Sequence, residues 1–402
     1  MNKININIIG GGPVGLFMGV CLKSKEDSNN YNVSIIEKRN KYTRENVIGL
    51  LVKDLKAIIS NKLYEKIKEV SCFRKLGNKK CYLVELDIIL IPLKLLEQIL
   101  YDECIKLGVN IIIDDDWKKH IDNTDILFLA TGNYNAIAEE LINTKYILKT
   151  TYYGMCMFFT PDKYKEYTST NNNIKPKIKS NRYRIFPVRK NNQMYIGTSL
   201  SKTEYDLLNK SSKILKENNQ EINIDTVPDK IKTIVKNGLN YYNFKNITNS
   251  KIFPVEFGIK YNSKIIENIT YKNKKILVCL IGNQAYNHHF FAGRGIIAGF
   301  NGCYYINKLI SANYKNGYQN TIKKKYINYI TKIRREEWKE YPDIIVPFEE
   351  LDELIKNQSK KILDNIAKTL NIPYYRVNKK ELAYILGCKY IENCIGNKYA
   401  KA

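Results

Sequence analysis

The sequence of 402 residues contains no long apolar run. A membrane-spanning helix needs about 18 consecutive apolar residues, and no stretch approaches that length. From Lys3 the chain passes directly into an Ile-rich segment, without the apolar region and cleavage site of a signal peptide. We therefore expect a soluble, intracellular protein located in the cytoplasm.

Paired cysteines and metal-ligand patterns are also missing. The nine cysteines are an odd number, and no two of them form a C-x-x-C pair. This distribution argues against a disulfide framework and against a zinc site. It predicts a reducing compartment and no bound metal.

Acidic residues are few relative to basic ones, 40 against 65, which gives a net charge of +25. Such an excess usually suggests nucleic acid, an anionic membrane or an acidic protein as partner. Here the lysines are spread along the whole chain, and the densest runs, Lys272–Lys275 and Lys323–Lys325, are short. We interpret most of them as solvated surface, expect no nucleic-acid partner, and keep an acidic protein partner open. Nothing in the sequence indicates an oligomeric state.

What the sequence does contain is the alternation of strands and helices that is typical of an α/β protein. "KININIIG", "PVGLFMGVCLKS" and "NVSIIEK" predict a strand, a helix and a second strand. Later segments continue the pattern with helices over 53–70 and 92–108 and buried strands over 109–113 and 124–132. From residue 151 the aromatic segments "TYYGMCMFFT", "RYRIFPV" and "QMYIGTSL" predict an inserted sheet.

Gly10, Gly12 and Gly15 form a G-x-G-x-x-G motif between the first strand and the first helix. Glycine at these positions permits a tight turn and lets the backbone approach a pyrophosphate at the helix N-terminus. Glu37 closes the second strand, where a carboxylate can bind the hydroxyl groups of an adenosine ribose. The motif in this context predicts a dinucleotide site, which could hold NAD or FAD.

A second glycine-rich segment decides between the two cofactors. "KKILVCLIG" is a buried strand, and Gly293 and Gly295 open a helix shortly after it. In flavoproteins of the hydroxylase type, a late strand returns to the same sheet, and a glycine-rich helix start faces the flavin. The order of strand, loop and helix in this sequence resembles that of these flavoproteins, in which the two loops hold the two ends of one long cofactor. The cofactor that this likeness implies is FAD.

Three stretches resemble the flavin monooxygenase domain of the MICAL proteins, within the wider p-hydroxybenzoate hydroxylase class. They are "VSIIEKRNKYTRENVIGL", "TDILFLATGNYNAIAEEL" and "LVCLIGNQAYNHHFFAGRGIIAGF". The resemblance implies a Rossmann-like FAD-binding domain with an inserted mixed β-sheet substrate domain and a C-terminal helical extension. The expected boundaries are 1–150 for the first part of the FAD domain, 151–260 for the insertion, 261–312 for the returning part and 313–402 for the helical region.

Carried over by position, the resemblance implies roles for individual residues. Glu37 would hold the adenosine ribose, and Arg39 and Arg44 would reach the adenine side and the pyrophosphate. Asn46, Trp117 and Gly132 would complete the cofactor site. The alternatives are that the two arginines are ordinary surface charges and that Trp117 packs in the core.

The sequence departs from the family pattern in the late loop. Asn283 stands where the family has Asp, which keeps a hydrogen-bond acceptor but loses a charge. Where the family has Glu-Pro-Phe-Trp-Pro, this sequence has Asn287, His288, His289, Phe290 and Phe291. His288 and His289 are the candidate catalytic residues, as proton donors, substrate contacts or a covalent flavin anchor. The alternative is that both are bystanders in a loop.

Three functions remain open. The first is an FAD-dependent monooxygenase that uses NADPH or NADH and O2 to oxygenate a nucleophilic substrate, such as a protein methionine, or releases hydrogen peroxide. The second is a flavin hydroxylase of a small aromatic or polyketide-like molecule. The third is a catalytically degenerate flavin fold that serves as a binding or interaction module.

Overall fold

The structure, a computed structural model, describes residues 3–24, 26–44, 46–76, 86–162, 183–188, 193–218, 220–241, 244–287, 295–314, 317 and 319–340. The chain divides into two compact units. The first comprises Met1–Gly77, Val84–Thr151 and Phe257–Lys332, and the second comprises Asn78–Leu83, Tyr152–Glu256 and Ile333–Ala402. Two long strands, β8 (Tyr146–Pro161) and β11 (Ile247–Asn262), carry the chain from one unit to the other.

A six-stranded sheet forms the centre of the first unit, in the order β12-β13-β7-β1-β2-β6. Its members are β1 (Ile4–Ile9), β2 (Tyr31–Glu37), β6 (Asn110–Ile113), β7 (Ile126–Leu129), β12 (Ile266–Tyr271) and β13 (Lys274–Leu280). All neighbours are parallel except β12, which pairs with β13 as an antiparallel edge. The central strand β7 is fully buried, as expected for a parallel sheet covered on both faces. The structure thus confirms the α/β class and the parallel sheet.

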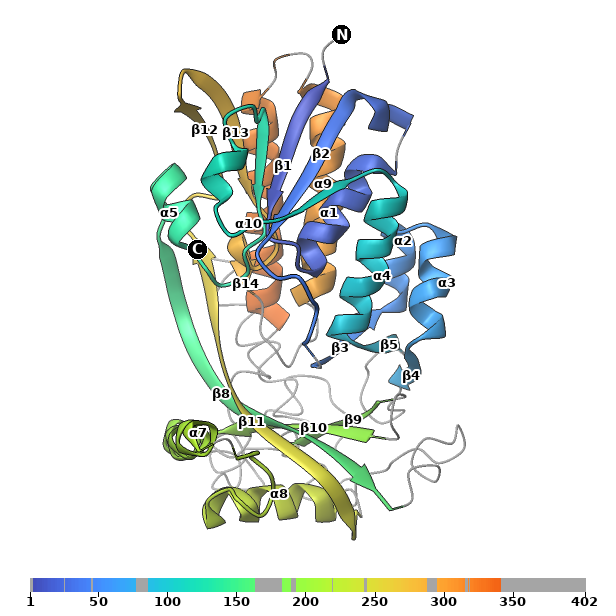
Figure 1. Ribbon diagram of the computed structural model, residues 1–402, viewed down its shortest axis with the longest axis vertical. Helices are drawn as coiled ribbons and strands as arrows, with labels where there is room; N and C mark the ends of the chain where they lie inside the picture. The colour runs from blue at the N-terminus through green and yellow to red at the C-terminus, as the bar shows by residue number, and fades with distance from the viewer. Residues whose placement is uncertain are drawn as a thin grey trace, which may run out of the picture. The chain divides into compact units, whose positions relative to one another are not determined.

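Helices from distant parts of the sequence cover this sheet. They are α1 (Pro13–Lys23), α4 (Leu93–Lys106), α5 (Ala136–Ile142) and α9 (Gly295–Asn313). Figure 1 shows α9 beside α1, although the two helices are far apart in the sequence. The rings of Phe17 and Phe300 stack with their centroids 4.1 Å apart, and Asn307 donates to the carbonyl of Cys21 (2.8 Å). These contacts join the returning segment to the first βαβ unit.

The helix α10 (Gln319–Glu340) begins in the first unit and packs on the returning strands. Tyr326 is fully buried, and its hydroxyl group donates to the carbonyl of Leu280 at the end of β13 (2.9 Å). Lys323 forms an ion pair with Glu267 of β12. Within the described part of the chain, every helix is too short or too polar to cross a membrane.

A small antiparallel sheet in the first unit was not predicted. It has the order β3-β5-β4, from β3 (Val47–Leu51), β4 (Cys72–Leu76) and β5 (Leu86–Pro92). The helix predicted over 53–70 is also divided into α2 (Val52–Ile58) and α3 (Asn61–Glu69). The reason is Ser60, whose side chain accepts a bond from the N–H of Leu63 (3.3 Å) and so starts a new helix.

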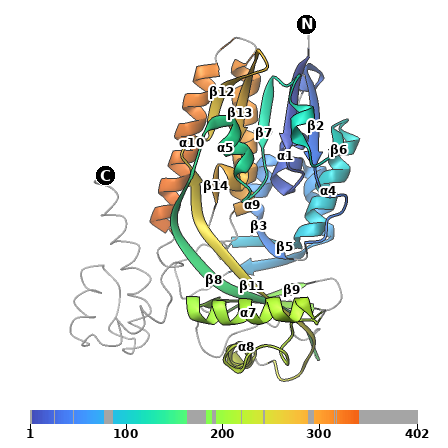
Figure 2. The ribbon, with the colours of Figure 1, turned by 60° about the vertical axis from the view of Figure 1, so that its left-hand side comes forward.

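The second unit contains the aromatic strands. β8 pairs with β10 (Gln193–Leu200), which pairs in turn with β9 (Tyr183–Val188), and both pairings are antiparallel. The side chains on one face of this sheet pack against the helices α7 (Lys202–Glu217) and α8 (Asp229–Tyr241) and form a hydrophobic core with them. Figure 2 shows both helices beside these strands. The core residues Met155, Met157 and Phe159 alternate along β8, as the period of a strand requires.

The stacked pair Phe17 and Phe300 generates a prediction about stability. Replacing Phe300 by Ala removes a fully buried ring from the α1–α9 contact. We expect the free energy of unfolding to fall by about 3–5 kcal/mol in urea denaturation. As a control, Ile327→Ala removes an aliphatic side chain that is 37% exposed on α10 and should cost less than about 1 kcal/mol. Equal losses in both variants would contradict the assignment of this contact.

Candidate functional site

The glycine loop lies between β1 and α1, and two of its glycines are required by close backbone contacts. Gly10 has a φ of +105°, and a Cβ there would lie 2.6 Å from the carbonyl oxygen of Ala130. A Cβ at Gly15 would lie 1.9 Å from the carbonyl oxygen of Gly10. Both distances are too short for any side chain, so Gly10 and Gly15 are needed for the loop to fold.

Gly12 has a different role, because the fold itself leaves room beside it. It is the N-cap of α1, with a φ of −75°, and no side chain caps the helix there. The nearest atom to a Cβ at Gly12 would be Nη2 of Arg44, at 3.5 Å. The first-turn amides of a helix have no partner within the helix, and the helix dipole makes this end positive. The start of α1 can therefore bind an anion, such as a phosphate group.

The late segment lies against this loop. β13 leads into the 3-10 turn η4 (Gly282–Gln284), and the N–H of Ile281 donates to the carbonyl of Leu129 (3.0 Å). A Cβ at Gly282 would lie 3.0 Å from Cγ1 of Val14, and a Cβ at Gly299 would lie 2.7 Å from Cγ2 of Val14. Two late glycines thus make room for one side chain at the start of α1. The structure brings together the two glycine-rich segments that the sequence places far apart.

A buried amide network, which the sequence analysis missed, fixes the late segment in place. The side-chain nitrogen of Gln284 donates to Oγ1 of Thr131 (2.8 Å) and to the carbonyl of Gly132 (3.2 Å). Asn262 donates to the carbonyl of Gln284 and to Oδ1 of Asn135, both at 2.8 Å. The network ties η4 to the loop after β7. The only signal in the sequence is an amide residue next to a buried strand, which does not reveal its partners.

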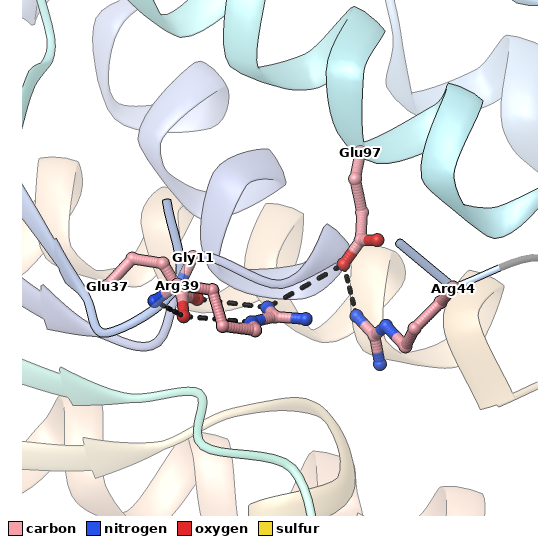
Figure 3. Close-up of polar contacts among 5 residues, drawn as sticks. All are labelled: Gly11, Glu37, Arg39, Arg44 and Glu97. Atoms are coloured by element: carbon pink, nitrogen blue, oxygen red, sulfur yellow. Dashed lines mark hydrogen bonds and ion pairs between the residues drawn. The ribbon is translucent and has the colours of Figure 1, made fainter. Parts of the chain in front are cut away.

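Glu37 lies at the end of β2 and is almost completely buried. Figure 3 shows its carboxylate between the N–H of Gly11 and the guanidinium of Arg39. Oε2 accepts from Gly11 (2.7 Å) and from Nη2 of Arg39 (3.0 Å), and Oε1 accepts from the N–H and Nε of Arg39 (both 2.9 Å). Burial by itself would raise the pKa of Glu37, but the bonds from Arg39 and Gly11 outweigh it and hold the pKa below its ordinary value.

Glu97 completes the charged cluster and was also missed. It lies on α4, fully buried, and its Oε1 accepts from Nη2 of Arg44 and lies 3.8 Å from Nη2 of Arg39 (Figure 3). Burial raises the pKa of Glu97 above its ordinary value, although both arginines oppose the shift. The signal in the sequence was Glu97 itself, an acidic residue between Leu96 and Leu100 on the apolar face of a helix.

The remaining predicted residues are placed as follows. Asn46 precedes β3, and its carbonyl accepts from the N–H of Leu93 (2.8 Å). Trp117 begins the 3-10 turn η2 (Trp117–His120), and the ammonium group of Lys118 lies 5.4 Å from the centre of its ring.

Five further candidates lie in or next to the late segment. Asn283 is the half-buried central residue of η4, and Gly295 is the first residue of α9. His288, His289 and Gly293 lie outside the described residues.

Comparison with solved structures identifies the fold. The Diels-Alderase PyrE3 of the pyrroindomycin biosynthetic pathway matches with a TM-score of 0.60 at 11% identity, over 96% of this chain and 80% of that one. The flavin-dependent brominase Bmp2 matches with a TM-score of 0.59 at 11% identity, over 100% of both chains. The anhydrotetracycline hydroxylase OxyS from Streptomyces rimosus matches with a TM-score of 0.56 at 10% identity, over 96% of this chain and 76% of that one.

The chain therefore has the fold of the flavin-dependent monooxygenases and halogenases. No protein-family model and no curated protein matches its sequence. The three structural neighbours are named for three different reactions. At these identities the fold is what they share with this chain, and the reaction depends on the chain's own residues.

The two carboxyl groups of the cluster generate a prediction about pH. The pKa of Glu37 is lowered on folding, so its contribution to stability is present above its ordinary value of about 4.5 and is lost as pH falls through the folded pKa. The pKa of Glu97 is raised on folding, so its contribution is present below about 4.5 and is lost as pH rises through the folded pKa.

We expect the two single variants to show these opposite slopes. The stability of the unaltered chain relative to Glu37→Gln should shrink as pH falls below about 4.5. Its stability relative to Glu97→Gln should grow as pH falls toward about 4.5 from neutrality. Urea unfolding across this range measures both differences. Parallel slopes would show that the two carboxyl groups do not have the opposite environments described above.

Proposed function

We propose that this chain binds FAD and is an oxidoreductase of the flavin monooxygenase type that acts on a small organic molecule. The observation that carries the proposal is the meeting of two glycine-rich segments at Val14. A short ligand such as a mononucleotide would need only the first loop. A long cofactor with a pyrophosphate in its middle would use both segments, one for each end.

The residues at the first loop fit the adenosine and pyrophosphate part of FAD. The open space at Gly12 and the uncapped start of α1 suit a pyrophosphate, and the guanidinium of Arg44 lies beside that space. Glu37 would hold the adenosine ribose. Arg39 would lie on the adenine side, and Asn46 and Trp117 stay candidates for further contacts.

The late segment would hold the flavin half. Asn283 would bond the ribityl chain through its amide. Gly132 presents an open backbone, because a Cβ there would meet no atom of the described residues within 4 Å. α9 begins at Gly295, and Gly293 stays a candidate contact just before it. The positive end of the α9 dipole would stabilise negative charge on a reduced flavin. A bound FAD would supply the hydride and oxygen chemistry that side chains lack. NADPH or NADH is the proposed reductant, and His288 and His289 are the proposed proton-transferring residues.

A small molecule is the better supported substrate. A hydroxylase of anhydrotetracycline and a flavin-dependent brominase have this fold. In the second unit, Cys156, Phe158 and Tyr195 are buried on the face of the sheet opposite to the core that packs on α7 and α8. The rings of Phe158 and Tyr195 are 5.0 Å apart, and Tyr195 donates to the thiol of Cys156 (2.7 Å). The exposed fractions of these three side chains are 6% or less, so the proposal of a small-molecule substrate rests on the structural neighbours and not on this face.

Two other functions follow from single observations. The oxidation of a protein methionine, as in the MICAL family, is favoured by the net charge of +25, which would attract an acidic protein. A catalytically degenerate binding module is favoured by Asn283 and by the engagement of Glu37 with Arg39. Oxidation of NADPH or NADH with consumption of O2, stimulated by a small aromatic compound, separates the proposed enzyme from both.

Flavin binding is the first test, and the glycines provide matched variants. Gly12→Ala places a methyl group where the fold tolerates it but a pyrophosphate would not. We expect the purified chain to carry FAD or to be reconstituted by it, and Gly12→Ala to lose at least about tenfold in affinity with little loss of stability.

The control is Gly302→Ala in α9, where a Cβ would lie 3.9 Å from the hydroxyl of Tyr326. It should bind FAD like the unaltered chain. A chain that binds no FAD in any preparation would exclude the proposed enzyme. Normal flavin content in Gly12→Ala would show that the loop does not hold the pyrophosphate.

Asn283 provides a second test of the late segment. Asn283→Asp keeps an acceptor and makes the bond to a ribityl hydroxyl charge-assisted, so FAD affinity should stay the same or rise by a few-fold. Fluorescence titration of flavin-free protein measures the change, with Asn273→Asp in the exposed β12–β13 turn as control. A loss of more than about tenfold for Asn283→Asp alone would show that the amide nitrogen has another task.

A further inference from the structure

The carboxylate of Glu37 has no acceptor position left for a ligand. It accepts four hydrogen bonds, one from Gly11 and three from Arg39, at 2.7 to 3.0 Å. A carboxylate offers about four such positions. Two of the bonds come from backbone N–H groups and two from the guanidinium of Arg39. A ribose hydroxyl can therefore bind Glu37 only after that guanidinium has moved away.

Glu97 offers the guanidinium another acceptor a short distance away. Nη2 of Arg39 already lies 3.8 Å from Oε1 of Glu97, and Figure 3 shows Arg39 between the two carboxylates. Oε2 of Glu97 is buried and accepts no hydrogen bond from any residue that the structure describes. An unpartnered oxygen of a buried carboxylate is costly, so a donor that reaches it is favoured.

The same carboxylate also holds the second guanidinium of the cluster. Oε1 of Glu97 accepts from Nη2 of Arg44, and this nitrogen lies 3.5 Å from the position that a Cβ of Gly12 would take. Glu97 thereby keeps the guanidinium of Arg44 beside Gly12, where a phosphate group would bind. Glu97 touches neither Gly12 nor Glu37 in these contacts, and its influence on a ligand passes through the two arginines.

We propose that Glu97 is a positioning residue for the adenosine end of the cofactor, which receives the guanidinium of Arg39 when a ribose binds Glu37. The exchange breaks the two side-chain bonds from Arg39 to Glu37. Ribose hydroxyls replace them on Glu37, and Arg39 forms new bonds to Glu97, which continues to hold Arg44. Two carboxylates face two guanidinium groups before and after, so no net charge becomes buried. The inference rests on the proposed FAD site.

ADP and adenosine are the probes, because they carry the ribose without the flavin. Calorimetric titration of the full, flavin-free chain with ADP should show affinity at least about tenfold weaker for Glu97→Gln. The matched control is Glu103→Gln on the same helix, where a buried carboxylate is paired with Lys66 (2.9 Å) and Lys106 (3.5 Å). It should stay within about twofold of the unaltered chain.

The role of Arg39 is measured separately with adenosine, which has no phosphate for Arg44 to contact. Glu97→Gln should weaken adenosine binding several-fold in the unaltered chain. In an Arg39→Met background there is no guanidinium to receive, so the same change should have an effect of less than about twofold. An equal loss in both backgrounds would show that Glu97 acts only through the fold, and would overturn the proposal.

A structure of the unaltered chain with ADP decides the matter even if Glu97→Gln does not fold. Arg39 should then lie within hydrogen-bond distance of Glu97, with the ribose on Glu37. Arg39 still bonded to Glu37 would overturn the proposal. If the unaltered chain binds neither ADP nor FAD, the proposed function fails as well. If it binds both and Glu97→Gln binds ADP equally well, only the present inference fails.

Discussion

The close approach of backbone segments around Val14 is the constraint on which the rest of the first unit depends. A Cβ at Gly299 would lie 2.7 Å from Val14, where something would have to shift, and a Cβ at Gly282 would lie 3.0 Å from it at a positive φ of +59°. The absence of side chains at these two positions lets α9 and the end of β13 lie close to the start of α1. The stacking of Phe17 on Phe300 and the bond from Asn307 to Cys21 follow from that approach. The contacts around Val14 thus join the beginning of the chain to its late segment.

Two polar systems border this contact, and they stabilise it in different ways. On one side the amides of Gln284 and Asn262 fix the late turn without any charge. On the other side two carboxylates and two guanidinium groups form a cluster with no net charge, in which Glu37 and Glu97 have opposite pKa shifts. Neutral amides hold a backbone in one arrangement, whereas charged groups can exchange partners. If the chain binds FAD as proposed, this difference would suit a rigid flavin end and an adjustable adenosine end.

The comparisons limit what the fold alone can say. Proteins named as a Diels-Alderase, a brominase and a hydroxylase have this architecture. The chemistry therefore depends on a few side chains near the cofactor and on the surface that meets the substrate. In this chain, Asn283, His288 and His289 depart from the flavoprotein pattern, and they are among the side chains proposed to act near the cofactor. They do not affect the glycines that the fold requires.

Much of the first unit could be predicted from the sequence, because its signals are local. A few consecutive residues are enough to predict each Ile-rich strand, the glycine loop and the late strand. The likeness to flavoproteins supplied their order. The sheet β3-β5-β4 could not be predicted, since its strands are short and pair across other elements. The break at Ser60 was missed because an apolar helical pattern continues on both sides of it.

By itself the sequence determined the α/β class and the glycine loop, because residue type and spacing within one segment decide these features. The return of a late strand was implied by the likeness to flavoproteins. Only the tertiary structure decided which charged groups meet. Glu97 lies far from Glu37 and Arg39 in the sequence, and its burial among them depends on how α4 packs beside α1. The partner of a buried charge is a property of packing, and no local pattern encodes it.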